Sequence, residues 1–133
     1  MPGGYIYKKG ANFERGIVSL FWENGWAAVR AAGSGTTKYP VPDVVAVKDC
    51  EVVLVECKTT SKDRIHLKAA VEGFKRFARI SGARAYISVK FDREKPRFYD
   101  ICEILVAGKY TVTKKTEYLS FESLIGRQSR LSF

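Results

Sequence analysis

The sequence has 133 residues, of which 46% are hydrophobic, and this size favours one domain with its own core. It carries 23 Lys and Arg against 14 Asp and Glu, a formal net charge of +9, which favours a polyanionic partner such as nucleic acid; a charge that serves only solubility is the alternative. No run of about 18 apolar residues occurs, which argues against a membrane-spanning helix.

The three cysteines, Cys50, Cys57 and Cys102, are widely spaced in apolar surroundings and favour neither a disulfide framework nor a zinc cluster. We expect them to be reduced core residues. With no apolar leader at the start of the chain, we expect an intracellular, cytoplasmic protein associated with the nucleoid.

The first predicted elements are an arm and a helix. Residues 1–10 mix Gly, Tyr and Lys without a sustained period and predict a mobile basic arm. Asn12 can cap a helix that Asn24-Gly25 ends. Its apolar residues recur at helical spacing: Phe13, Ile17, Leu20 and Phe21.

A strand and a hairpin follow. Residues 26–32 predict a short strand, and residues 33–37 a flexible loop of Gly, Ser and Thr. The β-branched runs 43–47 and 51–59, joined by a turn at Lys48-Asp49, predict a hairpin.

The second half of the chain predicts one long helix, further strands and a short helix. Ser61 can cap a helix that Gly82 ends, with an apolar stripe of Leu67, Val71, Phe74 and Ala78. Residues 83–91 and 96–106 predict strands joined by a charged turn, 110–113 a further strand, and 120–125 a short capped helix. The predicted domain therefore spans 11–126, before a basic tail over 127–133. This order predicts an α/β domain with a central mixed sheet flanked by helices.

One group of charged residues lies at the end of the hairpin. Side chains alternate along a strand, so Glu56 and Lys58 project from one face and Cys57 from the other. Asp43 follows Pro42 at the start of the neighbouring run, and the hairpin brings it opposite the end of the Glu56 strand. Two carboxylates thus converge beside one lysine.

Carboxylate oxygens suit Mg²⁺ or Mn²⁺, which bind through one or two carboxylates together with a substrate phosphate. Such a cation polarises a phosphodiester and lowers the pKa of an attacking water, while Lys58 can orient that water or offset charge in the transition state. We expect phosphodiester hydrolysis. The alternative is a structural ion network in a basic binding module without catalysis.

These residues resemble a known family. Pro42-Asp43 with Glu56-Cys57-Lys58 resembles the PD-(D/E)xK nuclease signature. Phe13-Glu14-Arg15 with Arg30-Ala31-Ala32-Gly33-Ser34 resembles the archaeal Holliday-junction resolvases of the Hjc family. The resemblance covers roughly residues 8–105, and no motif matches after Val106. It implies a restriction-endonuclease-like fold.

The resemblance also implies an activity, a cofactor and site residues. The implied protein is a homodimer with two active sites, each nicking one of two opposed strands of a four-way DNA junction with Mg²⁺, for which Mn²⁺ substitutes. Asp43, Glu56 and the backbone carbonyl of Cys57 are the implied metal ligands, approached by Glu14 from the first helix. The resemblance also implies that Lys58 assists the nucleophile and that Ser34 serves from the loop. Arg15 and Arg30 are implied to contact phosphate or support the site.

Further residues are candidates for contacts with DNA and with a second subunit. The DNA-facing candidates, besides Arg15 and Arg30, are Lys8, Lys9, Lys38, Lys62, Arg64, Lys68 and Arg79. Phe74 and Phe77 are candidates for the dimer interface, with plain core packing as the alternative. A junction-resolving endonuclease is the preferred hypothesis. A superfamily nuclease for other DNA substrates and the non-catalytic module are the alternatives.

Overall fold

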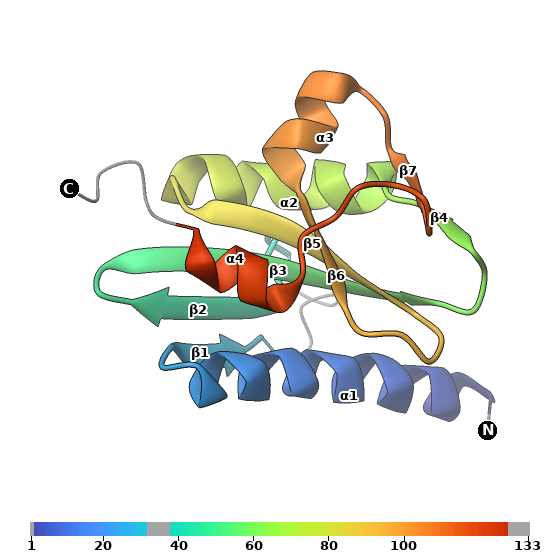
Figure 1. The fold of residues 1–133 in the computed structure, drawn as a ribbon, viewed down its shortest axis with the longest axis horizontal. Coiled ribbons are helices and arrows are strands. Elements are labelled where there is room, and N and C mark those ends of the chain that lie inside the picture. Colours follow the sequence, from blue (N-terminus) through green and yellow to red (C-terminus); the bar gives the residue numbers. More distant parts are fainter. Residues whose placement is uncertain (1, 32–37, 128–133) are drawn as a thin grey trace.

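The computed structural model describes the backbone of residues 2–31 and 38–127, and the side chains in these ranges from Lys9 onward. This part of the chain forms one layered α/β domain (Figure 1). In chain order its elements are α1 (Pro2–Glu23), β1 (Ala27–Arg30), β2 (Val44–Lys48), β3 (Glu51–Thr60), β4 (Arg64–His66), α2 (Lys68–Ser81), β5 (Arg84–Phe91), β6 (Arg97–Asp100), α3 (Ile101–Ala107), β7 (Thr111–Thr113) and α4 (Phe121–Gly126).

The central layer is a sheet whose strands, over the described residues, lie in the order β1-β2-β3-β5-β6. The β3–β5 pair is parallel and the other neighbours are antiparallel. A parallel pair needs a crossover connection, which the segment containing α2 supplies. The predicted mixed sheet flanked by helices is therefore confirmed. β4 and β7 pair separately as a small antiparallel sheet.

Helices cover both faces of the central sheet (Figure 1). On one face, α1 and α4 pack on a core that includes Phe21, Phe121 and the β3 residue Val55. On the other face, α2 and α3 pack on a core that includes Val71 and the β3 residue Leu54. The alternation of buried residues along β3 follows from the two-residue period of a strand. None of the helices in the described part combines the length and apolar character that a membrane crossing needs.

The hairpin of β2 and β3 is confirmed, with its turn one residue later than predicted. Asp49 and Cys50 have positive φ values of 49° and 66° and form the turn, instead of Lys48-Asp49. Two successive positive φ values match the twist of a tight antiparallel hairpin. β2 and β3 pair from Lys48↔Glu51 to Val44↔Val55, which leaves Asp43 and Glu56 just beyond the paired segment.

Two predicted helix starts are wrong. α1 begins at Pro2, so the stretch predicted as an arm over 1–10 is helical from Pro2 on; Ala11 is buried and the Lys9–Asp92 ion pair ties this end to the fold. Ser61 does not cap α2. The segment 64–66 forms β4 against β7, and α2 starts after Leu67, whose backbone N donates to the carbonyl of Tyr110.

The strand predicted over 96–106 is also wrong beyond Asp100. The Asp100 carboxylate accepts a hydrogen bond from the Cys102 backbone N at 2.8 Å and caps α3, which ends at Gly108 with a φ of 65°. The short final helix is confirmed, because Ser120 caps α4 through the backbone N of Ser123. The predicted tail beyond Arg127 lies outside the described residues.

None of the three cysteines forms a disulfide, and only Cys57 packs against the core. Cys57 packs against the core beneath α1, whereas Cys50 in the hairpin turn and Cys102 on α3 are exposed. The prediction that all three are core residues is therefore wrong for Cys50 and Cys102. Cys50 is exposed because it lies in the hairpin turn, which was predicted one residue earlier. Cys102 is exposed because it lies on α3, in a stretch predicted as a strand.

Candidate active site

Asp43 is fixed by hydrogen bonds to two neighbouring strands. Its carboxylate Oδ2 accepts from the Cys57 backbone N at 2.8 Å, and its own backbone N donates to Glu56 Oε1 at 3.2 Å. On the other side, its carbonyl accepts from the Ala31 backbone N at 2.8 Å. Asp43 is only 7% exposed, so this carboxylate is held rigidly at the open end of the hairpin.

Glu56 lies beside Asp43 in a partly buried position. Burial, and after it the charge of Asp43, raise the pKa of Glu56 to about 8 against the opposing effect of the Lys58 ammonium. Two close carboxylates repel one another, so in the absence of a cation one of them favours its protonated form. A divalent cation would relieve this repulsion. The predicted convergence of Asp43, Glu56 and Lys58 is present in the structure.

Glu14 reaches the same region from α1. Its Oε1 accepts from Arg30 Nε at 3.0 Å, and both side chains are 18% exposed. Burial raises the pKa of Glu14 and the charge of Asp43 raises it further, against the opposing effect of Arg30. Glu14 is therefore within electrostatic reach of Asp43, and Arg30 on β1 orients it.

Cys57 contributes its backbone to the site and its side chain to the core. Burial raises the pKa of the Cys57 thiol well above its ordinary value, and the charges of Asp43 and Glu14 add to that effect. The thiol therefore stays protonated and is a poor metal ligand. Its backbone carbonyl remains the group to consider, as the resemblance implied.

The donor set fits a cation that keeps several waters. No group of three or more His, Cys, Asp or Glu side chains within the described ranges has the geometry of a complete metal site. Mg²⁺, however, commonly binds through one or two carboxylates and completes its octahedron with water and substrate phosphate. Asp43 and Glu56 meet that requirement, with a carbonyl beside them.

The other predicted site residues are less closely tied to this centre. Arg15 is exposed and donates from Nη1 to Asn12 Oδ1 at 3.3 Å, so it lies on the outer side of α1. Ser34 lies outside the described residues, as does the side chain of Lys8. Lys9 pairs with Asp92 at 2.7 Å. The remaining basic candidates are exposed: Lys38, Lys62, Arg64, Lys68 and Arg79.

Of the two phenylalanines predicted at a dimer interface, one is a core residue. Phe74 is 3% exposed beneath α2, because it belongs to the same helical stripe as Val71. Phe77 instead lines an apolar hollow of about 270 Å³ with Ile80 of α2 and the segment 39–41. Sequence reasoning missed Ile80, which is 78% exposed; an isoleucine off the buried stripe was the available signal.

Comparison with known proteins gives consistent matches. The family model of archaeal Holliday junction resolvase (hjc) matches residues 5–132. The crossover junction endodeoxyribonuclease Hjc of Archaeoglobus fulgidus is 39% identical over 94 residues, 70% of this chain and 69% of that protein. The protein of the same name from Methanocaldococcus jannaschii is 32% identical over 129 residues, 94% of this chain and 92% of that protein.

The fold of the chain also matches that of a solved Hjc structure. The solved structure of the Holliday junction resolvase Hjc from Archaeoglobus fulgidus matches with a TM-score of 0.76 at 30% identity, covering 86% of this chain and 97% of that one. The match of the family model extends through the segment after Val106, for which the sequence showed no motif.

Proposed function

The chain belongs to the archaeal Holliday junction resolvase (Hjc) family, and we propose that it works as a homodimeric endonuclease that resolves four-way DNA junctions by nicking two opposed strands. The observation that carries the proposal is the pair Asp43–Glu56, two partly or fully buried carboxylates held together at the end of the hairpin beside Lys58. A buried like-charge pair costs stability and is typical of a functional site.

The proposed cofactor is Mg²⁺, for which Mn²⁺ can substitute. Asp43, Glu56 and the backbone carbonyl of Cys57 would hold it, and Glu14 would approach from α1. The raised pKa of Glu56 supports this assignment, because it reflects burial first and then repulsion from Asp43, and a bound cation would offset that repulsion. When bound, the cation polarises the scissile phosphate and lowers the pKa of the attacking water.

Lys58, Arg30 and Glu14 have separate proposed roles. Lys58 lies two residues after Glu56 on the same face of β3, where its ammonium would orient the attacking water and offset the charge that grows on the phosphate. Arg30 would keep Glu14 aimed at Asp43 through their 3.0 Å ion pair. Arg15 and the exposed lysines would contact phosphates, and Ser34 would act from the loop.

A dimer suits this reaction, because two active sites at a fixed separation select two strands without reading bases. We propose that the subunits meet at the α2 edge formed by Phe77, Ile80 and the segment 39–41. Val29 and Val47 are exposed, and they project to the face of the sheet that α2 covers, because Ala28 and Ala46 pack under α1. The apolar edge therefore continues onto β1 and β2.

The test is cleavage of a synthetic four-way junction and of its linear duplex arms, each with Mg²⁺ and with EDTA. Paired nicks in the junction alone, abolished by EDTA, are the expected result. Cleavage of the duplex arms as well would favour a nuclease with a broader DNA substrate. Junction binding without cleavage would favour a non-catalytic module.

A further inference from the structure

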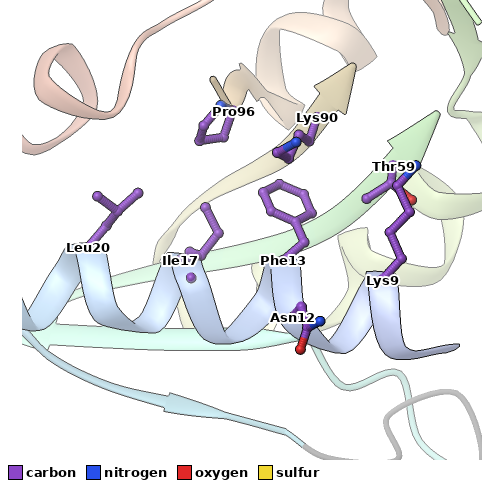
Figure 2. Close-up of a pocket in the computed structure, with 9 residues that line it drawn as sticks. Lys9, Asn12, Phe13, Ile17, Leu20, Thr59, Lys90 and Pro96 are labelled. Carbon is purple, nitrogen blue, oxygen red and sulfur yellow. The ribbon is translucent and has the colours of Figure 1, made fainter. Parts of the chain in front are cut away.

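A cavity of about 580 Å³ lies between α1 and the ends of β3 and β5, apart from the carboxylate centre (Figure 2). Its body is apolar and is formed by Phe13, Ile17 and Leu20 of α1, with Pro96 opposite. Lys9, Thr59 and Lys90 gather at one end (Figure 2). The cavity thus combines an apolar body with a polar, cationic end, and its size is that of ordinary small-molecule sites.

The cationic end carries an excess of positive charge. Lys9 Nζ bridges α1 to the turn after β5 through Asp92 Oδ1 at 2.7 Å. The hydrogen bond from Lys9 lowers the pKa of Asp92, and the charges of Lys9, Lys90 and Arg93 lower it further. Lys9 and Lys90 line this end of the cavity and Arg93 is within electrostatic range of Asp92, so positive charge exceeds negative charge here and the mouth attracts an anionic group such as a phosphate.

Adjacent residues connect this cavity to the candidate active site. Phe13 lines the cavity, whereas the next residue on α1, Glu14, faces Asp43. Thr59 lines the cavity, whereas the preceding residue on β3, Lys58, lies on the face of Glu56. Consecutive Cα atoms are about 3.8 Å apart. Thr59 and the cavity lie on the α1 face of β3, opposite the face of Glu56 and Lys58. A DNA strand held at the active site therefore has to pass the end of β3 to bring a neighbouring nucleotide to the mouth of the cavity.

We propose that this cavity receives one unpaired base of the bound junction, with the phosphate of that nucleotide held by Lys9 and Lys90. The proposal rests on the proposed function, because it requires a junction bound at the active site. The base would lie against Phe13 and Ile17, since aromatic and apolar surfaces accept any base without reading its sequence. The site would stabilise an opened branch point and so contribute to the recognition of junctions over duplex DNA.

Gly16 offers a way to fill the cavity without disturbing the core. It lines the cavity on the exposed side of α1, and a Cβ at this position meets no atom within 4 Å. Leucine also favours a helix more than glycine does. The blocking variant is Gly16→Leu. Gly16→Ala controls for the loss of glycine, and Ser19→Leu adds the same side chain to the exposed side of α1 outside the cavity lining.

The experiment uses junctions with a single 2-aminopurine placed in turn at each position next to the branch point, bound in EDTA so that no strand is cut. With the wild-type protein, Gly16→Ala and Ser19→Leu, fluorescence should change at one position on binding. Gly16→Leu should lose that change, and Lys90→Gln should weaken it. Binding without any position-specific change, or a change that Gly16→Leu retains, would overturn the inference.

A mismatch at the same position gives a second readout. Extruding a mismatched base costs less than extruding a paired one, so the mismatch should raise the affinity of the wild-type protein about tenfold and leave that of Gly16→Leu unchanged. An equal gain for both proteins would contradict the cavity as the receptor of the base. Failure of the wild-type protein to bind any junction would instead remove the proposed function, so the two failures are distinguishable.

Discussion

Asp43 and Glu56 restrain each other across the open end of the β2–β3 hairpin. The Asp43 backbone N donates to Glu56 Oε1 at 3.2 Å, and the charge of Asp43 joins burial in raising the pKa of Glu56 to about 8. The hairpin therefore holds a carboxyl group that is easier to ionise when the protein is unfolded than when it is folded.

This relationship predicts how stability depends on pH without divalent cations. The unfolded pKa of 4.5 lies below the folded value of about 8, so the folded state binds more protons between these values. Stability should therefore fall as pH rises from about 4.5 to 8, by about 4 kcal/mol from this group, because each unit of pKa difference corresponds to about 1.4 kcal/mol. Glu56→Gln should remove that fall, as measured by urea denaturation from pH 4 to 8.5.

Glu23→Gln is the control for the pH experiment, because Glu23 is exposed on α1 and the same substitution there should leave the pH profile unchanged. A Glu56→Gln profile that still parallels the wild-type profile would show that Glu56 does not carry this pH dependence.

Removal of one carboxylate should separate cleavage from binding. Asp43→Asn keeps the backbone donor to Glu56 and an oxygen for the Cys57 N–H, so the fold should persist. Junction cleavage should fall at least about a hundredfold, while junction affinity in EDTA stays within about twofold. Saturating Mg²⁺ should stabilise the wild-type protein by about 1 to 3 kcal/mol and the variant by much less. Full cleavage by Asp43→Asn would contradict a ligand role.

The carboxylate pair was predictable because it depends on local rules. The two β-branched runs around Asp49 set the hairpin, and the strand period placed Glu56 and Lys58 on one face. The contact between Glu14 and Arg30 was not predictable from pattern alone, since it joins residues on α1 and β1. Glu14 and Arg30 entered the predicted site only through the family resemblance.

The elements that sequence reasoning misplaced depend on partners far along the chain. β4 exists because residues 64–66 pair with 111–113, and no local signal identifies a three-residue strand. β6 ends at Asp100, whose carboxylate caps α3. The apolar run after Asp100 predicted a continuing strand instead of this helix. Phe74 was placed at an interface, although its spacing from Val71 put it on the buried stripe.

The Glu14–Arg30 pair should be energetically coupled more strongly than an exposed pair. Both side chains are only 18% exposed, so removing Arg30 leaves a largely buried carboxylate without its partner. A double-mutant cycle with Glu14→Gln and Arg30→Met should give a coupling energy of about 1 to 2 kcal/mol in urea denaturation. The more exposed Glu72–Lys75 pair on α2 is the matched control and should give a clearly smaller coupling energy, because solvent screens it. Equal couplings would argue that Arg30 does not orient Glu14.

The two phenylalanines of α2 should behave differently when replaced by glutamate. Phe77→Glu places a charge in the apolar hollow at the α2 edge, so it should yield folded monomers in sedimentation experiments. Phe74→Glu buries a charge in the core and should destabilise the subunit itself by about 4 kcal/mol. Val106→Glu, at a 90% exposed position on α3, should change neither property. A Phe77→Glu protein that sediments as a dimer would exclude this edge as the interface.

The basic surface should make junction binding strongly dependent on salt. If each protomer neutralises about six phosphates, it should contribute about −5 to the slope of the logarithm of affinity against the logarithm of salt concentration, as counterions are released from the DNA. Lys62→Gln should reduce the magnitude of that slope by about 1, because Lys62 is an exposed DNA-facing candidate next to the β3 end. Lys115→Gln, equally exposed but in the turn after β7, should leave it unchanged. A nearly flat salt response of the wild-type protein would contradict the assignment of DNA as the partner. It would mean that the basic side chains behind the formal charge of +9 make no contacts with phosphates.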